Sequence, residues 1–162
     1  MILKLRQRMA QEESGFTLVE LLVVMLIIGL LAAIAIPAFF NQRSKATDAN
    51  AKEAAHTSQV AMETYATDNG GSYVGATVAK LQAIEPTVPT GTAVAGKQSL
   101  AISGLSANGY TVTVTAATTA DTFSITNTGG TLTYPCNVPA TNTTSGGCVT
   151  TTGVTGAGTW GG

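Results

Sequence analysis

The chemistry available to this chain depends on very few side chains, and the most informative is a carboxylate in an apolar setting. Glu20 directly precedes twenty consecutive residues, Leu21 to Phe40, that carry no charge and no strongly polar group. A carboxylate near a membrane centre costs about 2.5–3.5 kcal/mol, and less near an interface. An ordinary anchor has no use for such a residue, so we interpret Glu20 as a functional residue whose charge is tolerated best beside a positive group.

A second chemical feature is the pair of cysteines. Cys136 and Cys148 are the only two in the chain, and they lie twelve positions apart. In an exported domain such a pair predicts one disulfide, which would close a loop of about a dozen residues and contribute roughly 2–4 kcal/mol. Two free buried thiols are the alternative. A zinc site would need more ligands, and the single histidine, His56, is far away in sequence and is expected to be an exposed helix residue.

The sequence does not predict an enzyme. It contains no Gly-rich phosphate loop, no metal-spaced cluster and no Gly-x-Ser-x-Gly motif. After Glu85 the only acid is Asp121, which is too few for a hard-cation site of the calcium type. We therefore predict no catalytic residue, no metal site and no cofactor.

Charge is scarce throughout the 162 residues. Only 10% of them are charged, against about 25% in a typical soluble domain, and the net charge is −1. No residue from Thr122 to Gly162 is charged, and Thr, Gly, Ser and Asn are abundant there. This pattern predicts a solvated, neutral surface suited to packing between copies, and it excludes the basic footprint of a nucleic-acid binder.

The apolar run is long enough to cross a membrane. At about 1.5 Å per residue, a helix of twenty residues spans roughly 30 Å of hydrocarbon. Lys4, Arg6 and Arg8 precede the run, so the positive-inside rule places the N-terminus in the cytoplasm. Arg43 and Lys45 follow the run and oppose that orientation.

Two generic interpretations of this N-terminus are a secretory signal peptide and an uncleaved membrane anchor. A candidate cleavage pattern for the signal peptide is present at Ala33-Ile34-Ala35. Against it, Glu20 would lie in the apolar region, the run continues through Phe40, and Glu12 and Glu13 come just before the apolar block. Neither interpretation explains the order of residues from Gly15 to Glu20.

The stretch Gly15-Phe16-Thr17-Leu18-Val19-Glu20-Leu21-Leu22-Val23-Val24 resembles the class III signal of type IV prepilins and type II secretion pseudopilins. In that family a prepilin peptidase cuts after the glycine on the cytoplasmic side and methylates the new N-terminus. The resemblance implies a cut between Gly15 and Phe16, with Phe16 becoming N-methylphenylalanine and Glu20 the fifth mature residue.

The resemblance also implies how the subunit assembles. Glu20 would pair with the new amine of its own chain or of an incoming neighbour, and the family uses the second arrangement to set axial register. Gly29 and Pro37 match the family's helix-loosening glycine and proline, and elsewhere they destabilise a helix by about 1 and 3 kcal/mol. For Gly29, close packing of helices in the membrane is the alternative.

Beyond the run, the pattern predicts that the helix continues to Asn69 and stops at Asn69-Gly70-Gly71, giving one helix of roughly fifty residues. A stripe at helical spacing would face a sheet; its members are Ala54, Ser58, Ala61, Met62 and Tyr65. Asp48 and Lys52 are expected to form an i,i+4 pair worth a few tenths of a kcal/mol.

The remainder predicts a short helix at Ala76–Ile84 followed by an antiparallel meander of three or four strands. The predicted strands are Ser99–Ser103, Tyr110–Ala116, Thr122–Asn127 and Thr131–Tyr134. From Pro135 onward no strand periodicity is visible, and Gly153 to Gly162 is expected to be a flexible or partner-ordered tail. Asn142-Thr143-Thr144 fits the glycosylation pattern, but so short a motif often arises by chance, and we expect it to be unused.

The sequence therefore predicts an α+β, pilin-like fold with four segments. These are a cytoplasmic leader at 1–15, a membrane and assembly helix at 16–40, an amphipathic helix half at 41–70 and an exported β-rich head at 71–162. The expected function is a structural subunit of a type IV pilus.

The alternatives are a type II secretion or competence pseudopilin and a monomeric membrane-anchored adhesion domain. The expected partners are the prepilin peptidase and methyltransferase, an inner-membrane assembly platform, the membrane, and other copies in a helical filament. Before assembly the subunit would cross the cytoplasmic membrane once, and afterwards it would lie in an extracellular or envelope filament.

Overall fold

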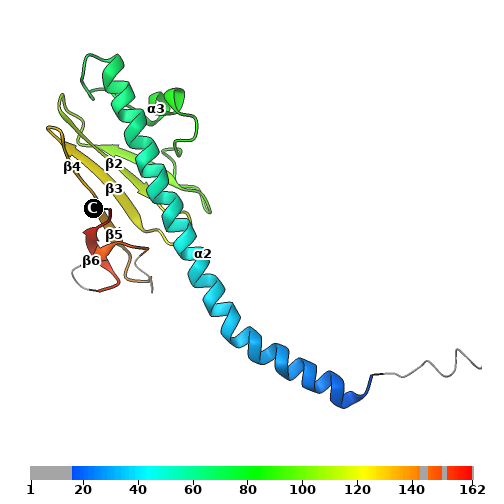
Figure 1. Ribbon diagram of the computed structural model, residues 1–162. Helices are drawn as coiled ribbons and strands as arrows, with labels where there is room; N and C mark the ends of the chain where they lie inside the picture. Colours follow the sequence, from blue (N-terminus) through cyan, green and yellow to red (C-terminus); the bar gives the residue numbers. More distant parts are fainter. Residues whose placement is uncertain (1–15, 143–145, 151–152, 162) are drawn as a thin grey trace, which may run out of the picture. The chain divides into compact units, whose positions relative to one another are not determined.

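The computed structural model describes residues 16–142, 146–150 and 153–161 (Figure 1). Among these residues, two helices, α2 (Leu18–Asp68) and α3 (Val78–Ile84), precede seven strands. The strands are β1 (Ser99–Ser103), β2 (Gly109–Thr115), β3 (Thr122–Thr128), β4 (Thr131–Thr133), β5 (Pro135–Val138), β6 (Val149–Thr150) and β7 (Gly156–Thr159). Contacts divide the chain into two units that meet between Phe40 and Asn41, and α2 runs through both.

The first unit, as far as the structure describes it, is a short lead-in and the apolar part of α2. All its large hydrophobic side chains are exposed, from Phe16 at 83% to Phe40 at 57%. α2 is long and apolar enough to cross a membrane, judged by length and composition. The predicted helix of roughly fifty residues is confirmed, since α2 has 51 residues.

In the second unit, the later part of α2 packs on the sheet through small side chains. The predicted stripe is confirmed, because all five of its residues are buried; they are Ala54, Ser58, Ala61, Met62 and Tyr65. α2 ends at Asp68, directly before the predicted stop signal. Gly70 and Gly71 both have positive φ, at 68° and 84°, which glycine adopts at low cost.

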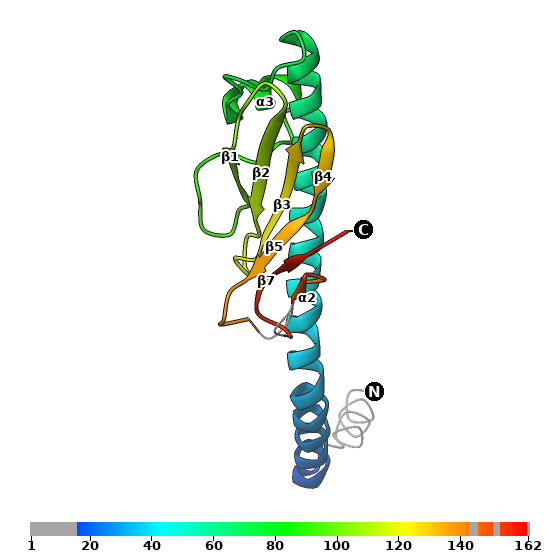
Figure 2. The same cartoon turned by 90° about the vertical axis from the view of Figure 1, so that its left-hand side faces the viewer.

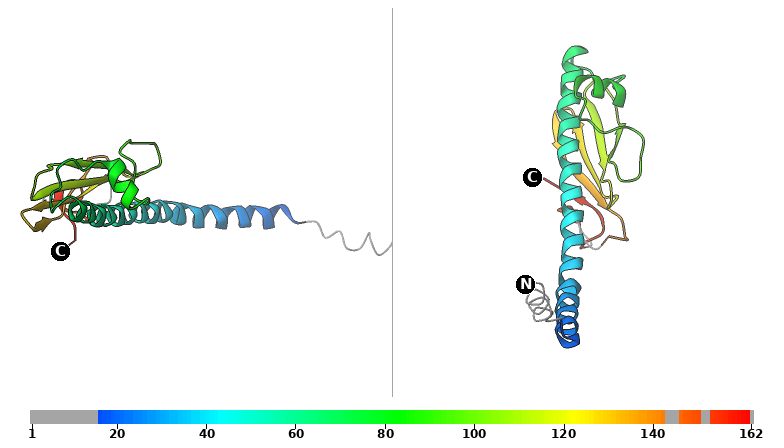
Figure 3. Two further views of the ribbon diagram at one scale, coloured as in Figure 1. Left: turned by 90° about the horizontal axis from the view of Figure 1, so that it is seen from above. Right: turned by 90° about the vertical axis from the view of Figure 1, so that its right-hand side faces the viewer.

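The sheet is antiparallel and has the order β1-β2-β3-β5-β7-β6, with β4 paired to β3. Figures 2 and 3 show the sheet and the second part of α2 as two layers. Alternation along β2 and β3 directs apolar residues such as Val112, Val114 and Phe123 into the core. Threonines occupy the other face, where Thr111 and Thr126 join their hydroxyls across the strands at 3.0 Å.

The strand count predicted from the sequence, three or four, is wrong, although the predicted strands all exist. β1 has the predicted bounds, β2 begins and ends one residue earlier than predicted, and β3 and β4 each differ from prediction by one residue at their last position. No periodic pattern marks β5, β6 and β7, because these strands have only two to four residues and β7 is Gly-Ala-Gly-Thr. In β7, a Cβ at Gly158 would collide with the Val149 carbonyl oxygen, so this strand pair requires glycine.

The expected flexible tail is also a wrong prediction, because Trp160 belongs to the core. Its side chain is 3% exposed. Its indole Nε1 donates to the carbonyl oxygens of Ser124 at 3.0 Å and Pro135 at 3.1 Å. The ring also meets the Phe123 and Tyr134 rings edge-on, with centroids 5.7 and 5.5 Å away. A buried aromatic with a satisfied N–H fixes the C-terminal strand on the sheet.

Replacing Trp160 with Ala should therefore destabilise the head by about 3–5 kcal/mol, the usual cost of truncating a buried large aromatic. The measurement is chemical denaturation of the full chain in detergent, followed by near-ultraviolet circular dichroism. Val149→Ala is the control, because that side chain is 74% exposed and should change stability by less than about 0.5 kcal/mol. Equal stability of the Trp160→Ala and native chains would contradict the assignment of this residue to the core.

Candidate functional site

The beginning of α2 is organised by a reciprocal pair, Thr17 and Glu20. The backbone N–H and the hydroxyl of Thr17 both donate to Glu20 Oε2 at 2.9 Å, and the Glu20 N–H donates to Thr17 Oγ1 at 3.2 Å. This arrangement is a capping box, which satisfies backbone donors that the first helical turn leaves free. The Glu20 carboxylate thus has neutral donors within its own chain. Gly15, the other side of the predicted cut, lies outside the described residues.

The rest of the first unit presents an apolar surface without polar interruption. Residues 21–31 and 33–40 are all exposed, and Ala32 is half-buried. Exposed apolar area of this extent is not stable in water and marks a surface that lipid or another protein covers. The apolar part of α2 is therefore suited either to crossing a membrane or to packing among copies of itself.

Gly29 and Pro37 both lie inside α2, and the helix is unbroken at each. A Cβ built on Gly29 would meet no atom within 4 Å, so no contact within this chain requires glycine there. Pro37 lacks the N–H that would bond to the carbonyl one turn earlier, which weakens the helix locally. Their predicted loosening role concerns assembly and stays a prediction.

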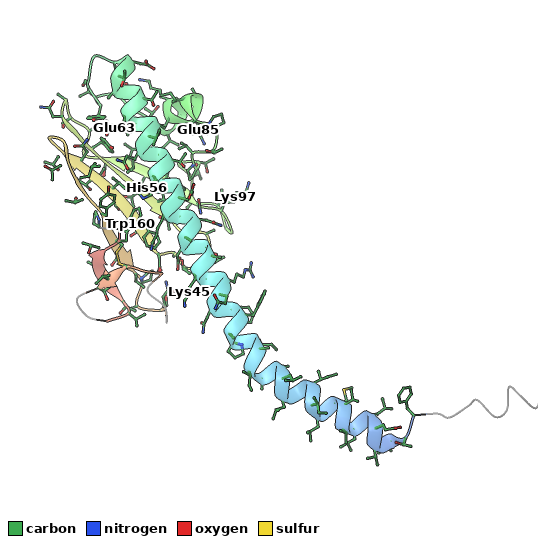
Figure 4. The ribbon with its side chains drawn as sticks, in the orientation of Figure 1. Lys45, His56, Glu63, Glu85, Lys97 and Trp160 are labelled. Atoms are coloured by element: carbon green, nitrogen blue, oxygen red, sulfur yellow. A yellow bond between two sulfur atoms is a disulfide. The ribbon has the colours of Figure 1, made fainter. Side chains whose placement is uncertain are left out.

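In the second unit, Glu63 of α2, labelled in Figure 4, joins the helix to Tyr110 in β2 and to Tyr73 in the loop after the helix. The Tyr73 and Tyr110 hydroxyls donate to the two oxygens of Glu63, each at 2.7 Å, and the Asn127 amide also reaches Glu63 at 3.4 Å. Burial, reinforced by the hydrogen bond to Glu63, raises the pKa of Tyr73 to about 12 and that of Tyr110 further. Both tyrosines therefore stay protonated donors at physiological pH, which holds the helix on β2 and β3.

A second cluster surrounds Trp160. The Lys52 ammonium lies 5.1 Å from the Phe123 ring centroid and 5.9 Å from that of Trp160, within the range of cation–π attraction. Burial lowers the pKa of Lys52. His56 is exposed, as expected from its position on the helix, and its ring packs edge-on against Trp160 with centroids 5.2 Å apart. These contacts hold the C-terminal strand against α2 (Figure 4).

The disulfide between Cys136 and Cys148 is present, with Cα atoms 5.9 Å apart. Cys136 lies in β5, and Cys148 directly precedes β6. Both are buried. The disulfide therefore joins β5 to the residue directly before β6. Trp160, which follows β7, and Lys52 hold β7 in place.

Asp48 and Lys52 were expected to form an i,i+4 pair, and their charges do interact, since each favours the charged form of the other. Asp48 is nevertheless fully buried. Its Oδ1 accepts from the Thr119 hydroxyl, and Asp121, also fully buried, accepts through Oδ1 from the Asn142 amide. The Oδ2 atoms of both carboxyl groups have no hydrogen-bond partner among the described residues. Burial, followed by the nearby charge of Asp48, raises the pKa of Asp121 to about 6, and burial also raises that of Asp48.

The same contacts bear on the glycosylation pattern at Asn142. Its amide nitrogen donates to the Thr119 carbonyl at 2.7 Å as well as to Asp121. A nitrogen with two acceptors on its own chain is not presented for modification. Thr143 and Thr144, the rest of the pattern, lie outside the described residues.

Some of these contacts have a local sequence pattern and others do not. The Thr17-x-x-Glu20 spacing is a capping-box pattern, so this contact can be recognised from the sequence. Glu63, Lys52 and Trp160 had no such signal, because their partners are far away in sequence. The Asp48 and Asp121 pair likewise depends on a contact between α2 and the turn before β3.

The buried carboxyl groups predict a pH dependence of stability. The Asp121 pKa is about 6 in the folded state and 3.8 ordinarily, so the folded chain holds a proton that the unfolded chain releases. Stability should be complete below about pH 4 and should fall by about 2 kcal/mol as the pH rises through 6, allowing for solvent screening. Thermal unfolding of the full chain between pH 4 and 8 measures this change.

Asp121→Asn should reduce the dependence to the part that Asp48 contributes, whereas Asp68→Asn, at an exposed position, should leave it unchanged. A native chain whose stability rises between pH 4 and 7 would contradict this account of the pair.

Comparison with known proteins identifies the N-terminal segment. Residues 11–36 match the family model described as the prokaryotic N-terminal methylation motif. No curated protein and no solved structure matches the chain. The matched range contains Gly15, Phe16, Glu20 and Gly29 and ends just before Pro37. This motif belongs to structural, pilin-type proteins and, with the apolar helix, fits a membrane-anchored precursor. The chain thus carries, at residues 11–36, the class III signal of type IV pilins and pseudopilins.

Proposed function

We propose that this chain is the precursor of a structural subunit of a type IV pilus. It is cut after Gly15, methylated at the new amine of Phe16 and polymerised through the apolar part of α2. The observation that carries the proposal is the methylation motif at residues 11–36, which extends into an apolar helix whose side chains are exposed. The segments follow as a leader at 1–15, an assembly helix at 16–40, an amphipathic half at 41–70 and an exported head at 71–162.

The geometry at Thr17 and Glu20 supports an assembly step. Cleavage would create a positive amine at Phe16, next to the residue whose backbone and hydroxyl now bond to Glu20. A carboxylate in an apolar environment is stabilised far more by a positive partner than by neutral donors. The amine of an incoming copy would therefore compete for the Glu20 carboxylate and set the axial register, with Gly29 and Pro37 letting the helix adapt.

The partners follow from these steps. Prepilin peptidase and methyltransferase process the N-terminus, an inner-membrane platform drives assembly, and other copies form the helical filament. The subunit crosses the cytoplasmic membrane with its N-terminus inside before assembly, and it lies in an extracellular or envelope filament afterwards. No step requires catalysis by this chain or a cofactor.

A type II secretion or competence pseudopilin is the second candidate, because the methylation motif is shared with that class. The disulfide of the head and the chain length favour the pilin. A monomeric membrane-anchored adhesion domain is the third, and it gives Glu20 no role.

Mass spectrometry of the mature N-terminus from native cells tests the processing step. We expect a chain that begins at methylated Phe16. A start after Ala35 would mean an ordinary secreted protein, and an intact Met1 would mean an uncleaved anchor. Either result would overturn the proposal.

Assembly is then tested with Glu20→Gln, measured as filament pelleted from sheared cells. Removing one partner of a charge pair in an apolar environment costs about 3–5 kcal/mol, so pelleted filament should fall about a hundredfold or more while processing at Phe16 continues. Glu53→Gln, at an exposed position of the same helix, is the matched control and should assemble normally. Normal assembly of the Glu20 variant would exclude this carboxylate from the assembly step.

A further inference from the structure

Within residues 41–162, five side chains are basic, and the structure engages two of them. Lys52 lies over the Phe123 and Trp160 rings. Lys80 donates to the Gly75 carbonyl at 2.8 Å and lies over the Tyr65 ring. The other three are exposed, and their side chains have no hydrogen bond or ion pair with any residue that the structure describes; they are Arg43, Lys45 and Lys97.

Two of these three free cations line one groove. Arg43, on α2, and Lys97, on the loop before β1, border a groove of about 560 Å³ that lies wholly within the second unit. Asn50 and Gln98 also line it, and their amides make no hydrogen bond to described residues. No lining residue is acidic. A groove with two unpaired cations, free amides and no carboxylate is complementary to an anion that carries hydrogen-bonding groups.

The position of Arg43 in the chain indicates where this anion comes from. Arg43 is only three residues after Phe40, the end of the apolar run. In a helix that distance is about 4.5 Å, so when the run spans a bilayer Arg43 lies at the level of the headgroups. Guanidinium groups bind phosphate oxygens in a two-pronged geometry, and basic residues beside a membrane segment attract anionic lipids.

We propose that this groove binds the phosphate headgroup of an anionic phospholipid while the subunit is in the membrane. The inference rests on the membrane-inserted stage of the proposed function. In this proposal Arg43 and Lys97 bind the phosphate, and the amides of Asn50 and Gln98 bind the polar headgroup. Basic residues on the exported side oppose the positive-inside rule, and lipid binding gives Arg43 a function that offsets this cost.

The test is native mass spectrometry of the full chain released from vesicles of phosphatidylcholine mixed with phosphatidylglycerol. We expect retained phosphatidylglycerol on the native chain. Each cation in the groove makes a charge-assisted contact with the phosphate that a merely nearby cation does not make, so Arg43→Gln and Lys97→Gln should each lower retention about tenfold. Lys45→Gln is the matched control, because it removes the same charge two residues from Arg43 but does not line the groove; retention should stay within about twofold.

Three results would overturn the inference. If Lys45→Gln and Arg43→Gln lowered lipid retention equally, the effect would be one of general charge. If Arg43→Gln left lipid retention unchanged, the groove would be excluded as the binding site. Displacement of the lipid by soluble glycerol phosphate at the same concentration would assign the site to a free phosphate.

Membrane insertion and the Phe16 N-terminus are measured on the same samples, so a processed, inserted chain without lipid preference refutes only this inference. A chain that does not insert refutes the proposed function as well.

Discussion

The rest of this structure depends on an apolar surface that water cannot solvate well. The side chains of residues 16–40 are exposed, apart from a half-buried Ala32, and Glu20 is the only charged group among them. Since every buried hydrophobic residue of the described chain lies at or beyond Ala51, this segment contributes nothing to the core of the head. The head must therefore be stable by itself, and the segment must be stabilised by lipid or by other chains.

Several of the few charged side chains of the head lie at contacts between α2 and the rest of the head. Glu63 accepts from two tyrosines, Lys52 lies over two aromatic rings, and Asp48 and Asp121 are fully buried. α2 meets the sheet mainly through alanines, which allow a close approach but supply little apolar area. Specific polar and aromatic contacts thus complement a small-residue interface, and the disulfide and Trp160 secure the C-terminal strands.

The correct predictions concern interactions between residues that are close in the sequence, and the missed features depend on residues that are far apart in it. The helix stop, the buried stripe and four strands depend on neighbours within a few residues, so local pattern was sufficient. β5 to β7 are held by a disulfide, by Trp160 and by glycines such as Gly158, none of which produces alternation. Asp48 has the spacing of an i,i+4 pair with Lys52, and its burial depends on residues far away in the sequence, such as Thr119 and Gly146.

The capping box at the start of α2 links this local level to assembly. Before cleavage, Glu20 needs no positive partner, because Thr17 supplies two donors and accepts one in return. In the proposed pathway, cleavage adds an amine one residue before Thr17 without changing the helix that positions the carboxylate. The new charge then competes with neutral donors for an acceptor already in place. Cleavage would then change the partner of the Glu20 carboxylate without moving it. Before cleavage the donors of Thr17 would keep this carboxylate from being unpaired in an apolar environment.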